Sequence, residues 1–170
     1  SNEGSRFHRV TVAANCGAYA SIAARKIALR VRFADVEPIT LGLSRATLER
    51  ALTPATRAVV VTHLYGLLGA VEELAALCRK RGIAVVEDCA QSFGALHNGK
   101  VVGSLGDTGS FSFYPTKVLG CYGDGGMVTT NSDAVNEHIR RLRNHGAAKP
   151  FLHTDIGMTR VNRWSAPNPM

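Results

Sequence analysis

Short apolar runs alternate with amphipathic stretches along this chain. The runs have the length and composition of strands and lie at residues 31–36, 59–62, 83–87, 110–113 and 127–130. The amphipathic stretches have helical spacing and lie at residues 18–29, 44–51, 70–81 and 134–144. Strands that alternate with helices predict an α/β fold, in which a mostly parallel sheet is flanked by helices and joined by right-handed crossovers.

Local signals mark where several of these elements begin and end. Ser44 is predicted to cap the second helix, with Thr47 in its first turn, and the helix should end before Pro54. Gly82 is expected to close the third helix. The dipeptide at residues 98–99, Asn-Gly between apolar neighbours, is the strongest hairpin signal in the chain.

A carboxylate and a lysine each follow a predicted strand. Asp88 ends the apolar run at residues 83–86, which we expect to be buried on both faces, and Lys117 follows the strand at 110–113. The carboxyl ends of parallel strands border the crevice where α/β sheets bind ligands. An anion and a lysine there suit pyridoxal phosphate, because the amine can form a Schiff base with the aldehyde and the carboxylate keeps the pyridine nitrogen protonated. Glu87 should point to the opposite face of its strand.

Each of these two residues has a simpler interpretation when it is taken alone. An aspartate after a strand is more often a helix N-cap, and a lysine after Pro-Thr is usually solvated. The surrounding sequence changes this balance, because three motifs occur in order: VVEDCAQSFG at residues 85–94, GSFSFYPTK at 109–117 and DGG at 124–126. In these motifs the chain resembles the DegT/StrS-type sugar aminotransferases, pyridoxal phosphate enzymes of the aspartate aminotransferase fold. Weaker likeness extends the resemblance from about Val10 to about Gly157.

The resemblance implies roles for five residues. Lys117 matches the lysine that holds the cofactor and shuttles the proton, and Asp88 matches the partner of the pyridinium nitrogen. Gln91 matches a glutamine that contacts the ring hydroxyl, and Ser112 matches a serine that binds the cofactor phosphate. Tyr19 stands where the family places an aromatic ring on the pyridine face, although it could equally be a core aromatic on a helix face.

The resemblance also implies an activity and a domain organisation. The family moves an amino group from glutamate or glutamine to a keto sugar of a nucleotide-linked hexose, and its members are homodimers that share their sites. Residues 1–158 are expected to be part of the large cofactor-binding domain, residues 159–170 an irregular tail, and the small C-terminal domain to be absent. No Ser-Gly-Thr-type phosphate-binding turn precedes Val10. The chain could therefore be an inactive remnant or a binding module that keeps the fold. A further alternative is an enzyme of the same fold that acts on another carbonyl, as a dehydratase or a general aminotransferase.

Composition narrows the remaining function classes. The chain has 170 residues and a formal net charge of +7, but its basic residues lie on helices or their exits and form no nucleic-acid reading motif. We therefore expect no nucleic acid as partner. No apolar stretch is long enough to cross a bilayer, so we expect no membrane as partner, and we expect a cytoplasmic location. The four cysteines form no CxxC pair, so no metal is expected, and His63 and Cys89 are interpreted as structural.

Overall fold

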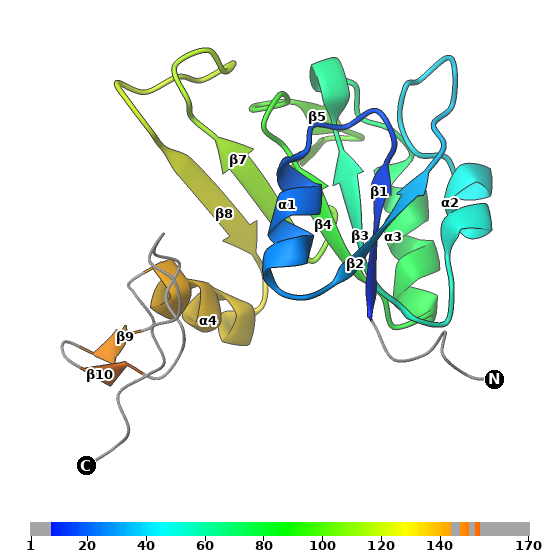
Figure 1. Ribbon diagram of the computed structural model, residues 1–170. Coiled ribbons are helices and arrows are strands. Elements are labelled where there is room, and N and C mark those ends of the chain that lie inside the picture. The colour runs from blue at the N-terminus through cyan, green and yellow to red at the C-terminus, as the bar shows by residue number, and fades with distance from the viewer. Residues whose placement is uncertain (1–7, 144–146, 150–151, 154–170) are drawn as a thin grey trace. The chain divides into compact units, whose positions relative to one another are not determined.

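A six-stranded sheet forms the centre of the protein, for which the computed structural model describes residues 8–143, 147–149 and 152–153. Its strands are β1 (Arg9–Ala13), β2 (Arg30–Ala34), β3 (Thr56–Thr62), β4 (Ala84–Asp88), β7 (Thr108–Ser112) and β8 (Gly126–Thr130). Their order in the sheet is β2-β1-β3-β4-β7-β8, and the first five are parallel. Figure 1 shows β8 running opposite to β7. The predicted mostly parallel α/β fold is confirmed, with β1 as a strand that the sequence analysis missed.

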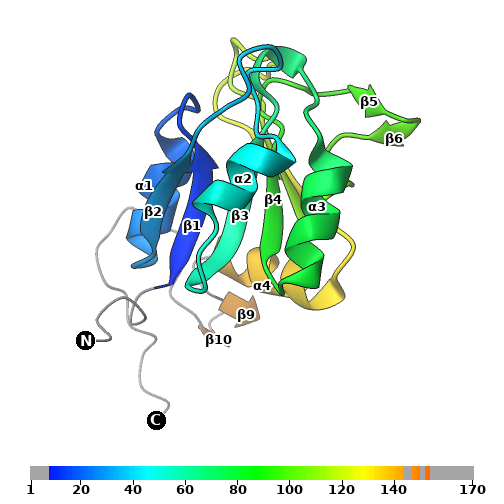
Figure 2. The ribbon, with the colours of Figure 1, turned by 90° about the vertical axis from the view of Figure 1, so that its right-hand side faces the viewer.

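Helices cover both faces of the sheet. On one face lies α1 (Tyr19–Lys26), and on the other lie α2 (Arg45–Ala51) and α3 (Val71–Lys80), as Figures 1 and 2 show. Alternation along the strands divides the core accordingly: Val12 packs with Ala24 on the α1 side, whereas Val59 packs with Leu74 on the α3 side. The apolar core therefore lies in two layers, one on each face of the sheet. The carboxyl ends of the strands lie at an edge of the sheet, where they can carry polar residues.

The local signals in the sequence mark real boundaries. Ser44 caps α2, and its hydroxyl and that of Thr47 each accept a hydrogen bond from the other residue's backbone N–H. Gly82 has a φ of +64° just after α3. Asn98 and Gly99, with φ values of +50° and +77°, join the two short strands of a hairpin, β5 (Leu96–His97) and β6 (Lys100–Val101).

Strand β4 departs from the expected burial on both faces. Val85 and Glu87 are buried on the α3 side, but Ala84 is exposed and Val86 is only half-buried. The expectation was wrong because Ala84, the first residue of β4, lies at the amino-terminal edge of the sheet and borders a surface hollow. The strand thus has one fully covered face and one partly open face.

A second compact unit begins at Thr130. It contains α4 (Asp133–Arg143), with three arginines in its last turn, and the antiparallel pair β9 (Ala147–Lys149) and β10 (Leu152–His153). The predicted helix is confirmed as far as Arg143, whereas Asn144 and the expected tail at residues 159–170 lie outside the described residues. Among the described residues, no helix has both the length and the apolar character needed to cross a membrane.

Glycine at position 109 lets the loop before β7 pass close to the strand. A β-carbon on Gly109 would lie 2.5 Å from the α-carbon of Gly103 and 2.5 Å from the hydroxyl of Thr129. That hydroxyl donates to the Gly103 carbonyl at 2.6 Å, so the neighbours are fixed. Only glycine at position 109 admits this packing.

We therefore expect Gly109→Ala to lower the free energy of unfolding by about 3 kcal/mol, because the methyl group would displace backbone. Urea denaturation followed by circular dichroism measures the change. Gly42→Ala is the control, since a β-carbon there would lie 3.8 Å from its nearest neighbour, at an ordinary contact distance. Equal effects of the two substitutions would contradict the close approach at Gly109.

Candidate functional site

The order of the strands places the switch point of the sheet between β1 and β3. The chain passes from β1 through α1 to β2 on one side, and then through α2 to β3 on the other side of β1. The carboxyl edge at such a switch point is where doubly wound sheets bind ligands. Four residues stand at this edge or its border: Asp88 and Ser112 are the last residues of β4 and β7, and Cys16 and His63 follow β1 and β3.

Asp88 stands at the end of β4, where it is half-buried. Its α-carbon is level with those of Thr62 on β3 and Ser110 on β7. Its Oδ1 accepts a hydrogen bond from the Ala90 backbone N–H at 3.2 Å. Burial and the nearby negative charge of Asp88 raise the pKa of the Cys16 thiol, so the loop after β1 lies within electrostatic reach of this carboxylate.

Lys117 lies in a loop whose two ends are tied together. The backbone N–H of Cys121 donates to the carbonyl of Phe113 at 2.9 Å, and that of Lys117 donates to the carbonyl of Tyr114 at 2.8 Å. The ring of Phe113 packs edge-to-face on Phe93, with ring centres 5.7 Å apart. The lysine is therefore carried by a loop whose base packs against the segment that follows Asp88.

The side-chain oxygens of Ser112 and Gln91 each accept a hydrogen bond from a backbone N–H. The hydroxyl of Ser112 accepts from the N–H of Tyr114 at 3.3 Å, so its proton stays available for donation. The Oε1 atom of Gln91 accepts from the N–H of Tyr65 at 2.8 Å. Tyr65 lies in the short turn η2 (Leu64–Gly66) at a φ of +57°, a left-handed conformation that costs a non-glycine residue about 1–2 kcal/mol.

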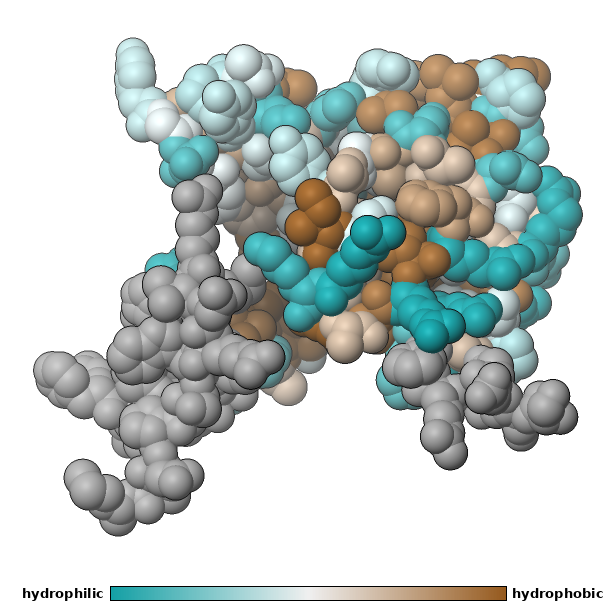
Figure 3. Space-filling model, in the orientation of Figure 1, coloured by the Kyte–Doolittle hydropathy of each residue, from teal (hydrophilic) through white to brown (hydrophobic). Residues whose placement is uncertain are grey.

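Tyr19 is the first residue of α1 and is 84% exposed. Its interpretation as a core aromatic is therefore wrong. Figure 3 shows brown apolar surface beside teal hydrophilic surface on the face that carries α1, and the exposed apolar side chains there include Ile22 and Ile27. The stacking role remains a prediction.

Behind Asp88 lies a fully buried hydrogen-bonded pair, His63 and Glu87, that the sequence analysis did not single out. The Nε2 atom of His63 lies 3.0 Å from Oε2 of Glu87, and both side chains are 0% exposed. The same carboxylate accepts three backbone N–H groups, from Gly103 at 2.9 Å and from Leu105 and Gly106 at 2.7 Å each. Glu87 points away from Asp88, as predicted. An ionisable residue within an apolar run was the available signal, because a buried charge needs partners.

These contacts determine the charge of Glu87. Burial raises the pKa of the Glu87 carboxyl, but the hydrogen bonds from His63 and from the three backbone amides outweigh it and hold the pKa below its usual value. Cys89 is also close, since one ligand atom from each of His63, Glu87 and Cys89 lies within 4.8 Å of the others. Burial and the charges of Glu87 and Asp88 raise the pKa of the Cys89 thiol to about 12, which disfavours the thiolate that a metal requires.

The lowered pKa makes Glu87 a source of stability above pH 4.5, its ordinary value. This contribution is lost as the pH falls through the folded-state pKa, because the unfolded chain binds the proton first. We expect Glu87→Gln to lower the free energy of unfolding by about 3 kcal/mol at pH 7 and to flatten its fall below pH 5.

Urea denaturation at a series of pH values measures both effects. Glu72→Gln is the matched control: Glu72 also has a lowered pKa, through Lys100 and Asn98, but it lies at the surface and should contribute much less. A pH dependence of Glu87→Gln that parallels that of the unsubstituted chain would contradict the assigned charge state.

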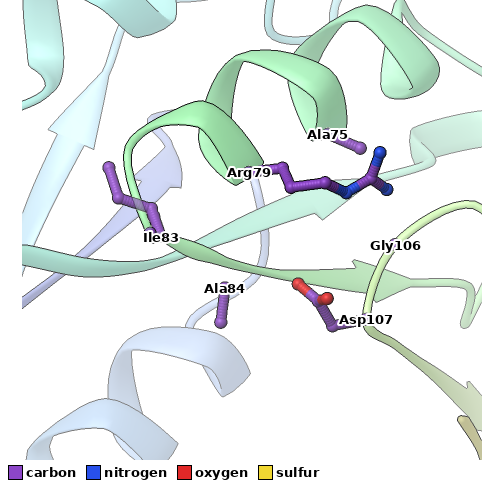
Figure 4. A pocket seen from close by; sticks show the side chains of 7 residues that line it. Ala75, Arg79, Ile83, Ala84, Gly106 and Asp107 are labelled. Carbon is purple, nitrogen blue, oxygen red and sulfur yellow. The ribbon is translucent and has the colours of Figure 1, made fainter. Parts of the chain in front are cut away.

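A surface hollow lies away from this edge. It has a volume of about 240 Å³ and is lined by residues at the start of β4 and by Arg79 of α3 and Asp107, as Figure 4 shows. Asp107 accepts from the Val85 N–H at 2.7 Å, which places it beside the amino-terminal half of the strand. The hollow and Asp88 thus occupy opposite ends of β4, and the hollow brings together none of the predicted site residues.

Comparison with known proteins gives one family for nearly the whole chain. Residues 10–166 match the profile of the DegT/DnrJ/EryC1/StrS aminotransferase family. A relative from Micromonospora megalomicea subsp. nigra, dTDP-3-amino-3,4,6-trideoxy-alpha-D-glucose transaminase, is 41% identical over 88% of this chain and 40% of its own length. A UDP-N-acetyl-3-dehydro-alpha-D-glucosamine 3-aminotransferase from Acidithiobacillus ferrooxidans is 46% identical over 74% of this chain and 34% of its own length.

Solved structures agree with the sequence comparison. The structure of DesV from S. venezuelae superposes with a TM-score of 0.84 at 34% identity, and the match covers 88% of this chain and 40% of that one. The chain thus spans about two fifths or less of the length of the proteins compared here.

Proposed function

Because the chain belongs to the DegT/DnrJ/EryC1/StrS aminotransferase family, we propose that it binds pyridoxal 5′-phosphate and serves amino transfer to a nucleotide-linked keto sugar. The observation that carries the proposal is the position of Asp88 and Lys117. Asp88 ends β4, Lys117 follows β7, and these two strands are paired neighbours whose carboxyl ends lie at one edge. An anion and a primary amine at one strand edge are the two groups that this cofactor requires.

The residues at this edge fit the cofactor chemically. Asp88 is half-buried, and Oδ1 already accepts one N–H from Ala90, so the carboxylate retains capacity to accept a proton donor such as a pyridinium nitrogen. Ser112 keeps its hydroxyl proton for a phosphate oxygen, and the exposed ring of Tyr19 is available for stacking. The Oε1 atom of Gln91 accepts the N–H of Tyr65, and this orients the side-chain amide so that its Nε2 group can donate to the hydroxyl oxygen of the cofactor ring.

The chain's own groups divide the work between orientation and proton transfer. When bound, pyridoxal phosphate supplies an electron sink for the carbon that loses its proton. Asp88 keeps the ring nitrogen protonated by favouring its charged form. Lys117 offers the only kind of side chain that can hold the aldehyde carbon, and its Nζ, once released, acts as the base and acid that moves the proton.

The proposed substrates follow from the relatives. The two relatives described above are named for amino transfer on dTDP- and UDP-linked sugars. We propose a keto sugar of a nucleotide-linked hexose as acceptor, and glutamate or glutamine as donor. The basic side chains of the chain, with its net charge of +7, would attract a diphosphate to the surface.

A homodimer is part of the proposal. The loop that carries Lys117 exposes several large apolar side chains: Tyr114, Val118, Leu119 and Tyr122. A second copy of the protein would remove this apolar surface from water beside the lysine. Sedimentation equilibrium tests this point, and a monomer at all concentrations would contradict it.

The amino-transfer proposal is tested by the first half-reaction. The purified chain is mixed with pyridoxal phosphate and then with glutamate, and 2-oxoglutarate is measured together with the visible absorbance. Amino transfer predicts one 2-oxoglutarate for each bound cofactor as the visible band disappears. A chain that binds the cofactor but releases the 2-oxo acid from neither glutamate nor glutamine would be a binding module that keeps the fold without turnover.

A further inference from the structure

His63 and Glu87 join the strand ends that carry the proposed cofactor contacts. We propose that they form a positioning pair, which sets Asp88 and Gln91 in the placement that the cofactor ring requires. This inference rests on the proposed function, because that function assigns Asp88 and Gln91 to the cofactor. The positioning pair is the cause of the placement of Asp88 and Gln91, and neither His63 nor Glu87 itself touches the cofactor.

Glu87 connects three segments of the chain. Glu87 lies on β4, and its Oε2 accepts a hydrogen bond from Nε2 of His63, which follows β3. Its two oxygens also accept hydrogen bonds from the backbone N–H groups of Gly103, Leu105 and Gly106, in the loop that leads to β7. All four donors lie between 2.7 and 3.0 Å from the carboxylate. A fully buried carboxylate with four donors has one favourable orientation, and it transmits that orientation to the segments that bind it.

The pair is connected to Asp88 through the backbone. Asp88 follows Glu87 directly, and its carbonyl accepts the backbone N–H of His63 at 3.1 Å. On the other side of the strand, the N–H of Cys89 donates to the carbonyl of Ser110 at 2.8 Å. The peptide unit after Asp88 is therefore held from both neighbouring strands, and this fixes the direction in which the Asp88 side chain leaves the sheet.

His63 also governs Gln91, through the turn η2. Tyr65 lies two residues after His63 and donates its N–H to Oε1 of Gln91. Its left-handed backbone is a conformation that a tyrosine leaves unless its surroundings hold it. Two side-chain contacts hold this turn, Gln91 on one side and His63, through Glu87, on the other, and they add to the backbone hydrogen bonds of the turn itself. Loss of the His63 contact would release the turn and with it the orientation of the Gln91 amide.

A merely structural role predicts a different response to substitution. Leu74 on α3 is as fully buried as His63 and packs in the core on the same side of the sheet, but it forms part of no hydrogen bond to the strand ends. Truncation of Leu74 should weaken the fold as a whole, whereas loss of a positioning contact should loosen the strand ends selectively.

Three variants of the full chain separate these roles. His63→Leu removes the donor to Glu87 at similar volume, His63→Gln returns an N–H group to that carboxylate, and Leu74→Ala is the control for lost packing. All three keep Glu87, so its three amide contacts can still form.

The first readout needs no cofactor and is backbone amide hydrogen exchange measured by NMR. In His63→Leu we expect exchange at Tyr65 and Cys89 to rise about tenfold relative to Val59 in the middle of β3. In Leu74→Ala the three rates should rise together, and in His63→Gln they should stay near those of the unsubstituted chain. A uniform rise in His63→Leu would overturn the positioning role.

The second readout is the affinity for pyridoxal phosphate, measured by absorbance titration. We expect His63→Leu to weaken binding about a hundredfold, because it would misplace two hydrogen-bonding groups, Asp88 and Gln91, each of which contributes about tenfold to affinity. His63→Gln should recover most of the affinity, and Leu74→Ala should keep it. Equal losses in His63→Leu and Leu74→Ala would overturn the proposal. If the unsubstituted chain binds no pyridoxal phosphate, the proposed function fails, and the exchange rates alone still decide whether the pair positions the strand ends.

Discussion

Lys117→Ala will show no visible absorbance band with pyridoxal phosphate and no incorporation of the cofactor after borohydride reduction. The expected effect is complete loss, because a primary amine is the one side-chain group that can form a Schiff base with the aldehyde. Lys117 is carried by a loop whose base is closed between Phe113 and Cys121. This loop contains no other lysine that could replace it. Absorbance spectroscopy and mass spectrometry of the reduced protein measure the two quantities.

Two further variants show whether the lysine acts by its amine or only by its charge. Lys117→Arg keeps the positive charge but cannot form the bond, so it should behave like Lys117→Ala. Lys80→Ala removes an exposed lysine from the last turn of α3 and should keep the full band. A band that persists in Lys117→Ala would exclude Lys117 from the assigned role.

Asp88→Asn is expected to keep the cofactor and lose amino transfer by about a hundred- to a thousandfold. The amide has the shape of the carboxylate but no charge, so it cannot favour the protonated form of the ring nitrogen. The rate of 2-oxoglutarate formation from glutamate measures the loss, and the absorbance titration shows whether binding is retained.

Asp107→Asn is the matched control for Asp88→Asn. Asp107 lies at the other end of β4, where its Oδ2 accepts the N–H of Val85, and an asparagine can still accept that hydrogen bond. We expect its amino-transfer rate to stay close to that of the unsubstituted chain. Similar losses in the two variants would mean that the effect of Asp88→Asn comes from the strand and not from the ring nitrogen.

Much of the fold follows from signals that act within a few residues. The capping pair Ser44 and Thr47 and the Asn98-Gly99 turn form as predicted, because each depends on local backbone geometry. Alternation along β4 correctly placed Glu87 and Asp88 on opposite faces. Burial of β4 on both faces was predicted wrongly, because the covering of Ala84 depends on which elements pack beside it.

The support of the candidate site lies beyond such local reasoning. His63 and Glu87 are 24 residues apart, and their contact depends on the register between β3 and β4. The three amides that complete the carboxylate's shell come from a loop 16 to 19 residues further along, and Gly109 leaves room for Gly103, the first of the three. The sequence shows a charge within an apolar run, but its partners appear only when the strands are assembled.

The central claim is that this chain holds pyridoxal phosphate on Lys117. It is tested most directly by titrating the purified chain with pyridoxal phosphate, reducing the complex with borohydride and mapping the labelled peptide. We expect a saturable visible band and one labelled site, at Lys117. No band, or label spread over Lys26, Lys80, Lys100 and Lys149, would contradict the account and leave the fold without the proposed function.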